Sequence, residues 1–177
     1  MLPDLYHRGS FPLPSEIDDA MKRRGTLLIG IGNPYRQDDG AGIAAVRRLR
    51  YLLPETIQCL ECTGDLTTLL DAWQGYERVI LIDAMHSGRA AGEVVHFEVS
   101  RQPLPANTRF SSTHAMGLNE MLALAHALNQ VPPELVIYGI EGQHFGEGEG
   151  LSPEVAKAVE DVVRYILEDL TKGEGDA

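Results

Sequence analysis

Two kinds of hydrophobic pattern alternate along the chain. Residues 26–31 form an apolar run of strand length, which is expected of a strand covered on both faces. Residues 40–53 instead carry Ile43, Val46 and Leu49 at spacings of three, with arginines between them, and this periodicity predicts an amphipathic helix. The same alternation continues toward the carboxyl end, with further strands predicted at 57–60, 79–83, 94–99 and 135–140, and further helices at 66–73, at 116–128 and from Ser152 onward.

This alternation of strands and helices predicts an α/β fold, a three-layer α/β/α sandwich around a mostly parallel, twisted sheet of about five strands. The segment 94–99 follows the strand 79–83 after only a Gly-containing loop, so we expect it to run antiparallel at a sheet edge. Ligands of such sheets bind beyond the carboxyl ends of the strands. The positions to search for a site are therefore those just after Ile31, Leu60, Ile82 and Ile140.

The chain length of 177 residues fits one domain with a short appendage, because single cores usually span roughly 100 to 200 residues. We assign the α/β domain to residues 25–170. In the appended segment 1–24, Ser15 followed by early acidic residues predicts a short helix. The polar residues 171–177 are expected to form a flexible tail.

Acidic residues outnumber basic ones, since Asp and Glu total 26, Lys and Arg total 15, and the formal net charge is −11. A field of this sign repels phosphate backbones and anionic lipid heads, which argues against nucleic-acid and membrane partners. No apolar run approaches the roughly 20 residues that cross a bilayer, and residues 1–24 do not resemble a secretory signal. The sequence therefore predicts a globular, cytoplasmic protein.

A Gly-rich turn follows the first predicted strand, in the segment 30–40. It differs from a nucleotide-binding turn, because Tyr35 stands where the dinucleotide fingerprint needs its last glycine, and no Gly-Lys-Ser or Gly-Lys-Thr precedes the helix. Asp38 and Asp39 open the helix instead. Carboxylates in this position either cap the helix or hold a cation, and the sequence leaves both interpretations open.

Asp83 and His114 are the other candidates for chemistry. Asp83 ends a buried strand, where a carboxylate is costly unless a cation or hydrogen-bond donors meet it. His114 stands at the junction between a long loop and a helix, where an imidazole can point into a cleft. Together with Asp39, these side chains form an open oxygen and nitrogen site for a divalent transition metal. The weaker histidine candidates are His7, His96 and His126.

Cys59 and Cys62 form a C-x-x-C pair, which suggests a redox pair, half of a zinc site or two small core residues. In one extended strand their Cα atoms would lie roughly 10 Å apart, beyond the reach of a disulfide. A second ligand pair for zinc is missing from the sequence, as is the G-x-S-x-G motif of a serine nucleophile. These observations favour the core interpretation.

Four motifs, in order over about residues 26–170, carry a family resemblance. They are Gly30–Asn33 with Asp38–Gly40, Val79–Ala84, Ser112–Leu118, and Gly139–Ile140 with Gly150–Val155. In these segments the chain resembles the hydrogenase maturation endopeptidases.

The resemblance implies a cytoplasmic protease that removes a C-terminal peptide from the large-subunit precursor of a nickel-iron hydrogenase, with the inserted nickel as the recognition signal. The two acids and one histidine that contact the metal and serve catalysis in that family map onto Asp39, Asp83 and His114. Nickel would arrive with the precursor, so we expect no tightly bound metal in the free protein, which we expect to be a monomer. Our hypothesis is that the trio completes the nickel coordination and fixes the scissile bond for attack by water, with the general base unassigned.

The sequence departs from the family pattern at residues 61–65, where many members have an Asp-Gly-Gly-Thr type turn, and in the appended residues 1–24. The Gly-rich, acidic loop 141–150 is either a solvated loop or a flap that recognises the precursor. Two other functions stay open. One is a nickel-sensing or hydrogenase-docking module without protease activity, and the other is a small-molecule hydrolase or nucleotide-binding oxidoreductase on the same architecture.

Overall fold

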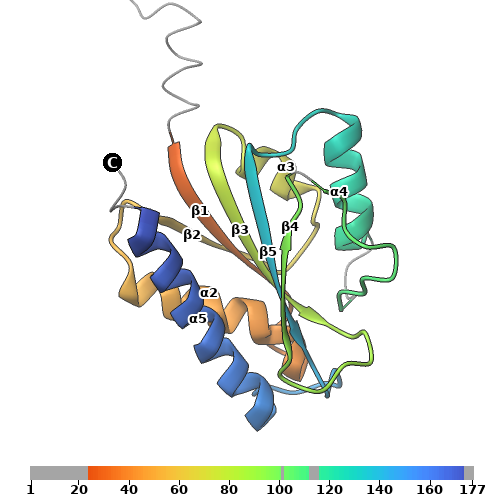
Figure 1. Ribbon diagram of the computed structural model, residues 1–177. Helices are drawn as coiled ribbons and strands as arrows, with labels where there is room; N and C mark the ends of the chain where they lie inside the picture. The colour runs from red at the N-terminus through yellow and green to blue at the C-terminus, as the bar shows by residue number, and fades with distance from the viewer. Residues whose placement is uncertain (1–23, 101, 112–115, 174–177) are drawn as a thin grey trace, which may run out of the picture.

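A five-stranded sheet covered by helices on both faces organises the protein in the computed structural model (Figure 1). The structure describes residues 24–100, 102–111 and 116–173. The helix predicted within residues 1–24, His114 and residues 174–177 of the predicted tail lie outside these ranges. Strands and helices follow each other as β1 Arg24–Ile31, η1 Gln37–Gly40, α2 Ala41–Leu52, β2 Gln58–Cys62, α3 Thr68–Ala72, β3 Tyr76–Met85, β4 Val94–Glu98, α4 Leu118–Ala127, β5 Glu134–Glu141 and α5 Pro153–Gly173.

The strands lie in the order β2-β1-β3-β5-β4. β1 pairs in parallel with β2 and β3, and β3 pairs in parallel with β5. β4 is antiparallel to β5 at one edge, in the register Val94 to Ile140 through Glu98 to Val136. The α/β class, the mostly parallel sheet and the antiparallel edge strand are thus confirmed.

Each face of the sheet carries its own hydrophobic core, because successive side chains of a strand point to opposite faces. Leu27 and Ile29 pack with α3 and α4, whereas Leu28 packs with α2 and α5. In Figure 1, α2 and α5 lie on one side of the sheet, and α3 and α4 lie on the other. The predicted three-layer arrangement is therefore present.

The strands are longer than their apolar runs. β3 begins at Tyr76, three residues before the predicted start at residue 79, because main-chain pairing continues through polar positions. Tyr76 pairs with Arg24 and Arg78 pairs with Thr26. The chain does not pass directly from β1 into α2, because the 3-10 turn η1 lies between the strand and the helix.

Cys59 and Cys62 both lie in β2, and neither forms a disulfide. Because they are three residues apart in a strand, their side chains point to opposite faces. Cys62 belongs to the core beneath α3 and α4, and Cys59 packs against the core beneath α2 and α5. Burial raises the pKa of both thiols. The structure thus agrees with the core interpretation of the pair.

Two glycines let α2 approach the sheet closely. A Cβ atom on Gly42 would lie within 3.0 Å of the carbonyl oxygens of Ile31 and Ile82, and one on Gly30 would lie within 3.0 Å of the carbonyl oxygen of Gly42. The first turn of α2 therefore rests directly on the carboxyl ends of β1 and β3. This contact fixes where η1, with its two acidic residues, sits above the sheet.

We predict that Gly42→Ala lowers the free energy of unfolding by about 1–3 kcal/mol, the usual cost of overpacking, because rigid main chain surrounds the added methyl group. Urea unfolding followed by circular dichroism measures this loss. Gly64→Ala is the matched control, since a Cβ atom at Gly64 meets nothing within 4 Å. Equal midpoints for the two variants would show that α2 does not rest on the strand ends as described.

Candidate active site

Asp83 lies near the carboxyl end of β3 and is 1% exposed. One carboxylate oxygen, Oδ1, accepts a hydrogen bond from the main-chain N–H of Ala84 at 2.8 Å. Burial, together with the negative charge of Asp39, raises the pKa of Asp83 well above the usual value for an aspartate. A buried carboxylate at a strand end is thus close enough to a second one for the two to repel each other.

Asp39 lies in η1 and is also 1% exposed. Its carboxylate oxygen Oδ2 accepts a hydrogen bond from the main-chain N–H of Asn33 at 3.0 Å. Gly32 has a φ of +141°, and a Cβ atom there would collide with the carbonyl oxygen of Asp39. The tight turn after β1 therefore requires this glycine and wraps around Asp39. Acids from two segments thus come together at the carboxyl ends of the neighbouring strands β1 and β3.

Asp38 has a structural role, in contrast to Asp39. Its fully buried carboxylate accepts four hydrogen bonds, from the N–H groups of Gln143 at 2.8 Å, His144 at 2.9 Å and Ser152 at 2.7 Å, and from the Ser152 hydroxyl at 2.7 Å. Burial alone would raise its pKa, but these donors outweigh burial and hold the pKa below the usual value. Asp38 therefore anchors the loop 142–152, and Asp39 is the metal-ligand candidate of the pair.

Glu141 at the end of β5 anchors a second loop. Its buried carboxylate accepts hydrogen bonds from the Ser87 N–H at 2.8 Å, the Ser87 hydroxyl at 2.7 Å and the Gly88 N–H at 2.9 Å. The sequence places Glu141 directly after the apolar run 135–140, at one of the strand ends expected to hold a site, but its role as an anchor was not predicted. Glu141 ties the connection between β3 and β4 to the end of β5.

A pocket of about 380 Å³ opens beside Asp83. One wall is the segment 109–111, which runs antiparallel to the end of β3: the His86 N–H donates to the Arg109 carbonyl at 3.0 Å, and the Ser111 N–H donates to the Ala84 carbonyl at 2.8 Å. The start of α4 forms another wall. The charged or titratable side chains that line the pocket in the described part of the chain are Asp83, His86, Arg109 and Glu120.

His114 lies in the stretch 112–115, outside the described residues. Ser111 and Gly117, the described residues on its two sides that line the pocket, do so together with Asp83. Within the described ranges, no three His, Cys, Asp or Glu side chains group together as a metal site. The structure therefore brings together two members of the predicted trio, Asp39 and Asp83, and leaves the third as a prediction.

His86 is a pocket residue that the sequence analysis missed. It follows the last residue of β3 and is exposed, and its ring stacks on Phe145 with 4.8 Å between ring centroids. The available signal was its position, three residues after Asp83 and just beyond the same strand end. The rule that directs attention to carboxyl ends of strands applies to it equally.

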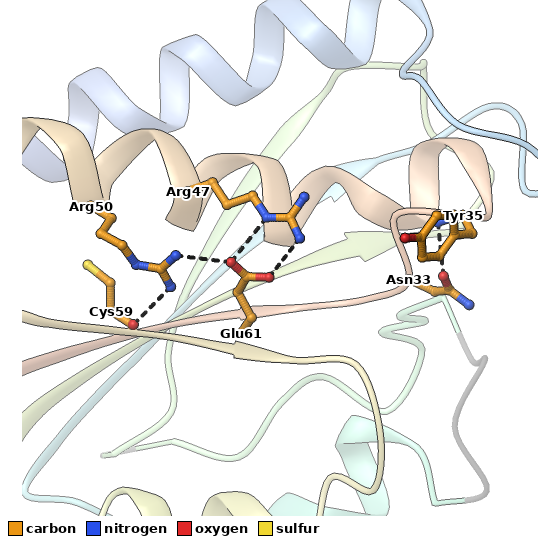
Figure 2. A network of polar contacts seen from close by, with 6 residues as sticks. All are labelled: Asn33, Tyr35, Arg47, Arg50, Cys59 and Glu61. Atoms are coloured by element: carbon orange, nitrogen blue, oxygen red, sulfur yellow. Dashed lines mark hydrogen bonds and ion pairs between the residues drawn. The ribbon is translucent and has the colours of Figure 1, made fainter.

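Glu61, the first residue of the segment 61–65 that departs from the family pattern, lies in β2 at the centre of the polar network in Figure 2. Arg47 of α2 donates two hydrogen bonds to the Glu61 carboxylate, at 3.1 and 2.9 Å, and Arg50 donates one at 3.1 Å. These arginines lower the pKa of Glu61 despite its partial burial. Arg50 also donates to the Cys59 carbonyl at 3.1 Å. Glu61 therefore joins β2 to α2 and serves the fold.

No helix in the described part of the chain is long and apolar enough to cross a membrane.

Comparison with known proteins links this geometry to one family. The family model described as hydrogenase maturation protease matches residues 46–169. A putative hydrogenase maturation protease of Methanocaldococcus jannaschii is 29% identical over 160 residues, which cover 86% of this chain and 100% of that protein.

Solved structures of hydrogenase maturation proteases are also similar to this chain. The [NiFe] hydrogenase maturation protease HybD from Thermococcus kodakarensis is 34% identical and superposes with a TM-score of 0.63, over 82% of this chain and 97% of that chain. The hydrogenase maturating endopeptidase HybD from Escherichia coli, at 21% identity, shares the fold with a TM-score of 0.66, over 84% of this chain and 93% of that chain. By the match of its family model and the likeness to the Thermococcus enzyme, the chain belongs to the hydrogenase maturation protease family, a family of peptidases.

Proposed function

We propose that this peptidase removes a C-terminal peptide from the nickel-loaded large-subunit precursor of a [NiFe] hydrogenase. The observation that carries the proposal is the pair of buried, mutually repelling carboxylates Asp39 and Asp83 at the carboxyl edge of the sheet, of which Asp83 lines a pocket. Two acids placed so close together favour a bound cation, because a divalent charge offsets both their burial and their repulsion.

The donor set suits nickel that comes with the substrate. Two carboxylates and one imidazole are ligands that a divalent transition metal accepts, and they leave coordination positions for groups of the precursor. We therefore assign Asp39, Asp83 and His114 to the nickel of the precursor and propose no tightly bound metal in the free protein. In this arrangement the metal acts as the recognition signal.

His114 is the third proposed ligand. It is three residues from Ser111 and three from Gly117, and both of these residues line the pocket with Asp83. We include His114 because the family resemblance assigns this histidine to the metal, and because the described residues on either side of the stretch 112–115 line the pocket.

In the proposed reaction, the three side chains hold the precursor by its metal centre and so place the neighbouring scissile peptide bond over the pocket. Fixing the bond in this way turns attack by water into a step between groups already in position. We place the reaction in the cytoplasm, with a monomeric protease. The net charge of −11 supports the absence of a nucleic-acid partner.

The experiment that tests this proposal incubates purified nickel-loaded precursor with the wild-type protein and with Asp39→Ala and His114→Ala, and follows the intact mass of the precursor. We expect loss of a C-terminal peptide with the wild-type protein and none with either variant. The control is His126→Ala, because His126 is an exposed residue of α4; this variant should cleave the precursor at the wild-type rate. A precursor that binds the wild-type protein but keeps its full mass would replace the protease with a docking module.

A further inference from the structure

His86 is placed to act on a substrate in the pocket. It is the first residue after β3, it lies three residues beyond Asp83, and both side chains line the pocket. Its main-chain N–H donates to the Arg109 carbonyl at 3.0 Å, which fixes the backbone from which the imidazole projects. The side chain is exposed, so it is accessible from the pocket.

The imidazole ring is held from one side. It stacks on Phe145 with an interplanar angle of 28°. Phe145 follows His144, whose N–H is bound by Asp38, and the Phe145 carbonyl accepts a hydrogen bond from Arg36 at 3.0 Å. The loop that Asp38 anchors thus supplies the surface against which the ring of His86 rests.

Within the described ranges, neither ring nitrogen of His86 takes part in a hydrogen bond with the protein, so the described contacts leave both nitrogens open to a substrate. A neutral imidazole accepts a proton through one nitrogen near neutral pH, and an imidazolium returns it. A stacked ring with open nitrogen edges, next to the proposed metal ligands, has the features of a proton-transfer group.

The other charged groups of the pocket fit this task less well. Arg109 carries no proton acceptor, because its guanidinium stays charged. Glu120 lies in the first turn of α4 with its carboxylate folded back against Gly117. Asp83, with Asp39, is assigned to the nickel of the precursor. Of the four charged or titratable residues that line the described pocket, His86 is therefore the one best suited to serve the attacking water.

We propose that His86 is the general base and then the general acid of peptide cleavage, an inference that rests on the proposed function. Its free ring nitrogen takes a proton from water as the water oxygen forms a bond to the scissile carbonyl carbon. The same proton then passes to the amide nitrogen of the leaving peptide as the C–N bond breaks. The products are a carboxylate and an amine, and the imidazole returns to its starting state. Phe145 is a positioning residue that keeps the ring in place.

The test compares the wild-type protein with His86→Gln in single-turnover cleavage of nickel-loaded precursor, and measures binding of the precursor separately. We expect the cleavage rate to fall about 100-fold or more, the usual contribution of general acid–base catalysis, while binding stays unchanged. His126→Gln, on the exposed face of α4, is the matched control. Phe145→Leu should lower the rate and leave binding intact, because it removes only the stacking partner.

The outcomes separate this inference from the proposed function. If the wild-type protein cleaves and His86→Gln cleaves within about threefold of it, the inference is wrong and the proposed function stands. If His86→Gln loses binding to nickel-loaded precursor in proportion to its rate, His86 binds metal or substrate and is not the base. If the wild-type protein itself leaves the precursor intact, the proposed function fails.

Discussion

Asp83→Asn is expected to abolish cleavage and, at the same time, to make the protein more stable at neutral pH. Cleavage is lost because the amide is a poor ligand for the precursor's nickel. Losing several kcal/mol of metal-dependent stabilisation of the transition state slows the reaction by more than about 100-fold. Stability rises because the pKa of Asp83 is raised by burial and by Asp39, so ionisation opposes folding.

The sign of this effect fixes its pH dependence. A carboxyl whose pKa is higher in the folded than in the unfolded state binds its proton more tightly when folded, so its contribution to stability is lost as pH rises from about 4 upward. The advantage of Asp83→Asn over the wild-type protein should therefore be small near pH 4 and grow toward neutral pH. Urea unfolding midpoints across this range measure it.

Asp71→Asn is the control for this prediction, because Asp71 is an exposed acid on α3. It should change neither the unfolding midpoint nor cleavage. A lower stability of Asp83→Asn at neutral pH would contradict this prediction. It would show that hydrogen-bond donors within the fold already stabilise the ionised Asp83 carboxylate, without a cation. Normal cleavage by Asp83→Asn would remove Asp83 from the proposed site.

Asp38→Ala is expected to be the most destabilising substitution of a polar residue. It leaves three main-chain N–H groups and one hydroxyl without their carboxylate acceptor, and each buried donor left unsatisfied costs about 1–3 kcal/mol, so we expect a loss of several kcal/mol. The pKa of Asp38 is held below its usual value, so its contribution is present above about pH 4 and is lost as pH falls through the lowered pKa. Chemical unfolding of the variant measures the loss.

Two further variants keep this prediction decisive if Asp38→Ala does not fold. Ser152→Ala removes only the hydroxyl donor and should cost about 1 kcal/mol, a typical single hydrogen bond. Asp71→Ala, an exposed change, should be neutral. If Asp38→Ala were as stable as Asp71→Ala, the loop 142–152 would not depend on Asp38.

Much of the fold was predictable because the central strands are nearly continuous apolar runs. β1 and β3 are buried on both faces, and their hydrophobic runs reveal them in the sequence. The polar start of β3 at Tyr76–Arg78 was not predictable in this way, because main-chain pairing with β1 keeps it in the sheet. The local hydrophobic pattern indicates which side chains are buried. Main-chain pairing with a neighbouring strand extends β3 beyond those buried positions.

The positions of Asp39 and Asp83 were predictable for a topological reason. Asp39 follows β1 and Asp83 lies near the carboxyl end of β3; these parallel strands are neighbours in the sheet, so their carboxyl ends meet at one edge. The division of labour between Asp38 and Asp39 was not predictable. The partners of Asp38 lie 105 to 114 residues away in the sequence, so no local pattern distinguishes the anchoring acid from its neighbour.

The pocket and His86 also depend on contacts between distant segments. The wall beside Asp83 forms because the segment 109–111 pairs with the end of β3. The ring of His86 is oriented by Phe145, which lies beyond β5. The position of His86 just beyond the end of β3 indicates the right edge of the sheet, but the contacts between distant segments show that, among the described histidines, this one shares the pocket with Asp83.

The most direct test of the central claim is the intact mass of a cognate large-subunit precursor after incubation with the wild-type protein, with the precursor loaded with nickel in one sample and free of nickel in the other. We predict that the nickel-loaded precursor loses a C-terminal peptide and that the nickel-free precursor keeps its full mass. Equal cleavage of both would show that nickel is not what the buried carboxylates recognise. Binding of the nickel-loaded precursor without any change in mass would contradict the assignment of this protein as the processing protease.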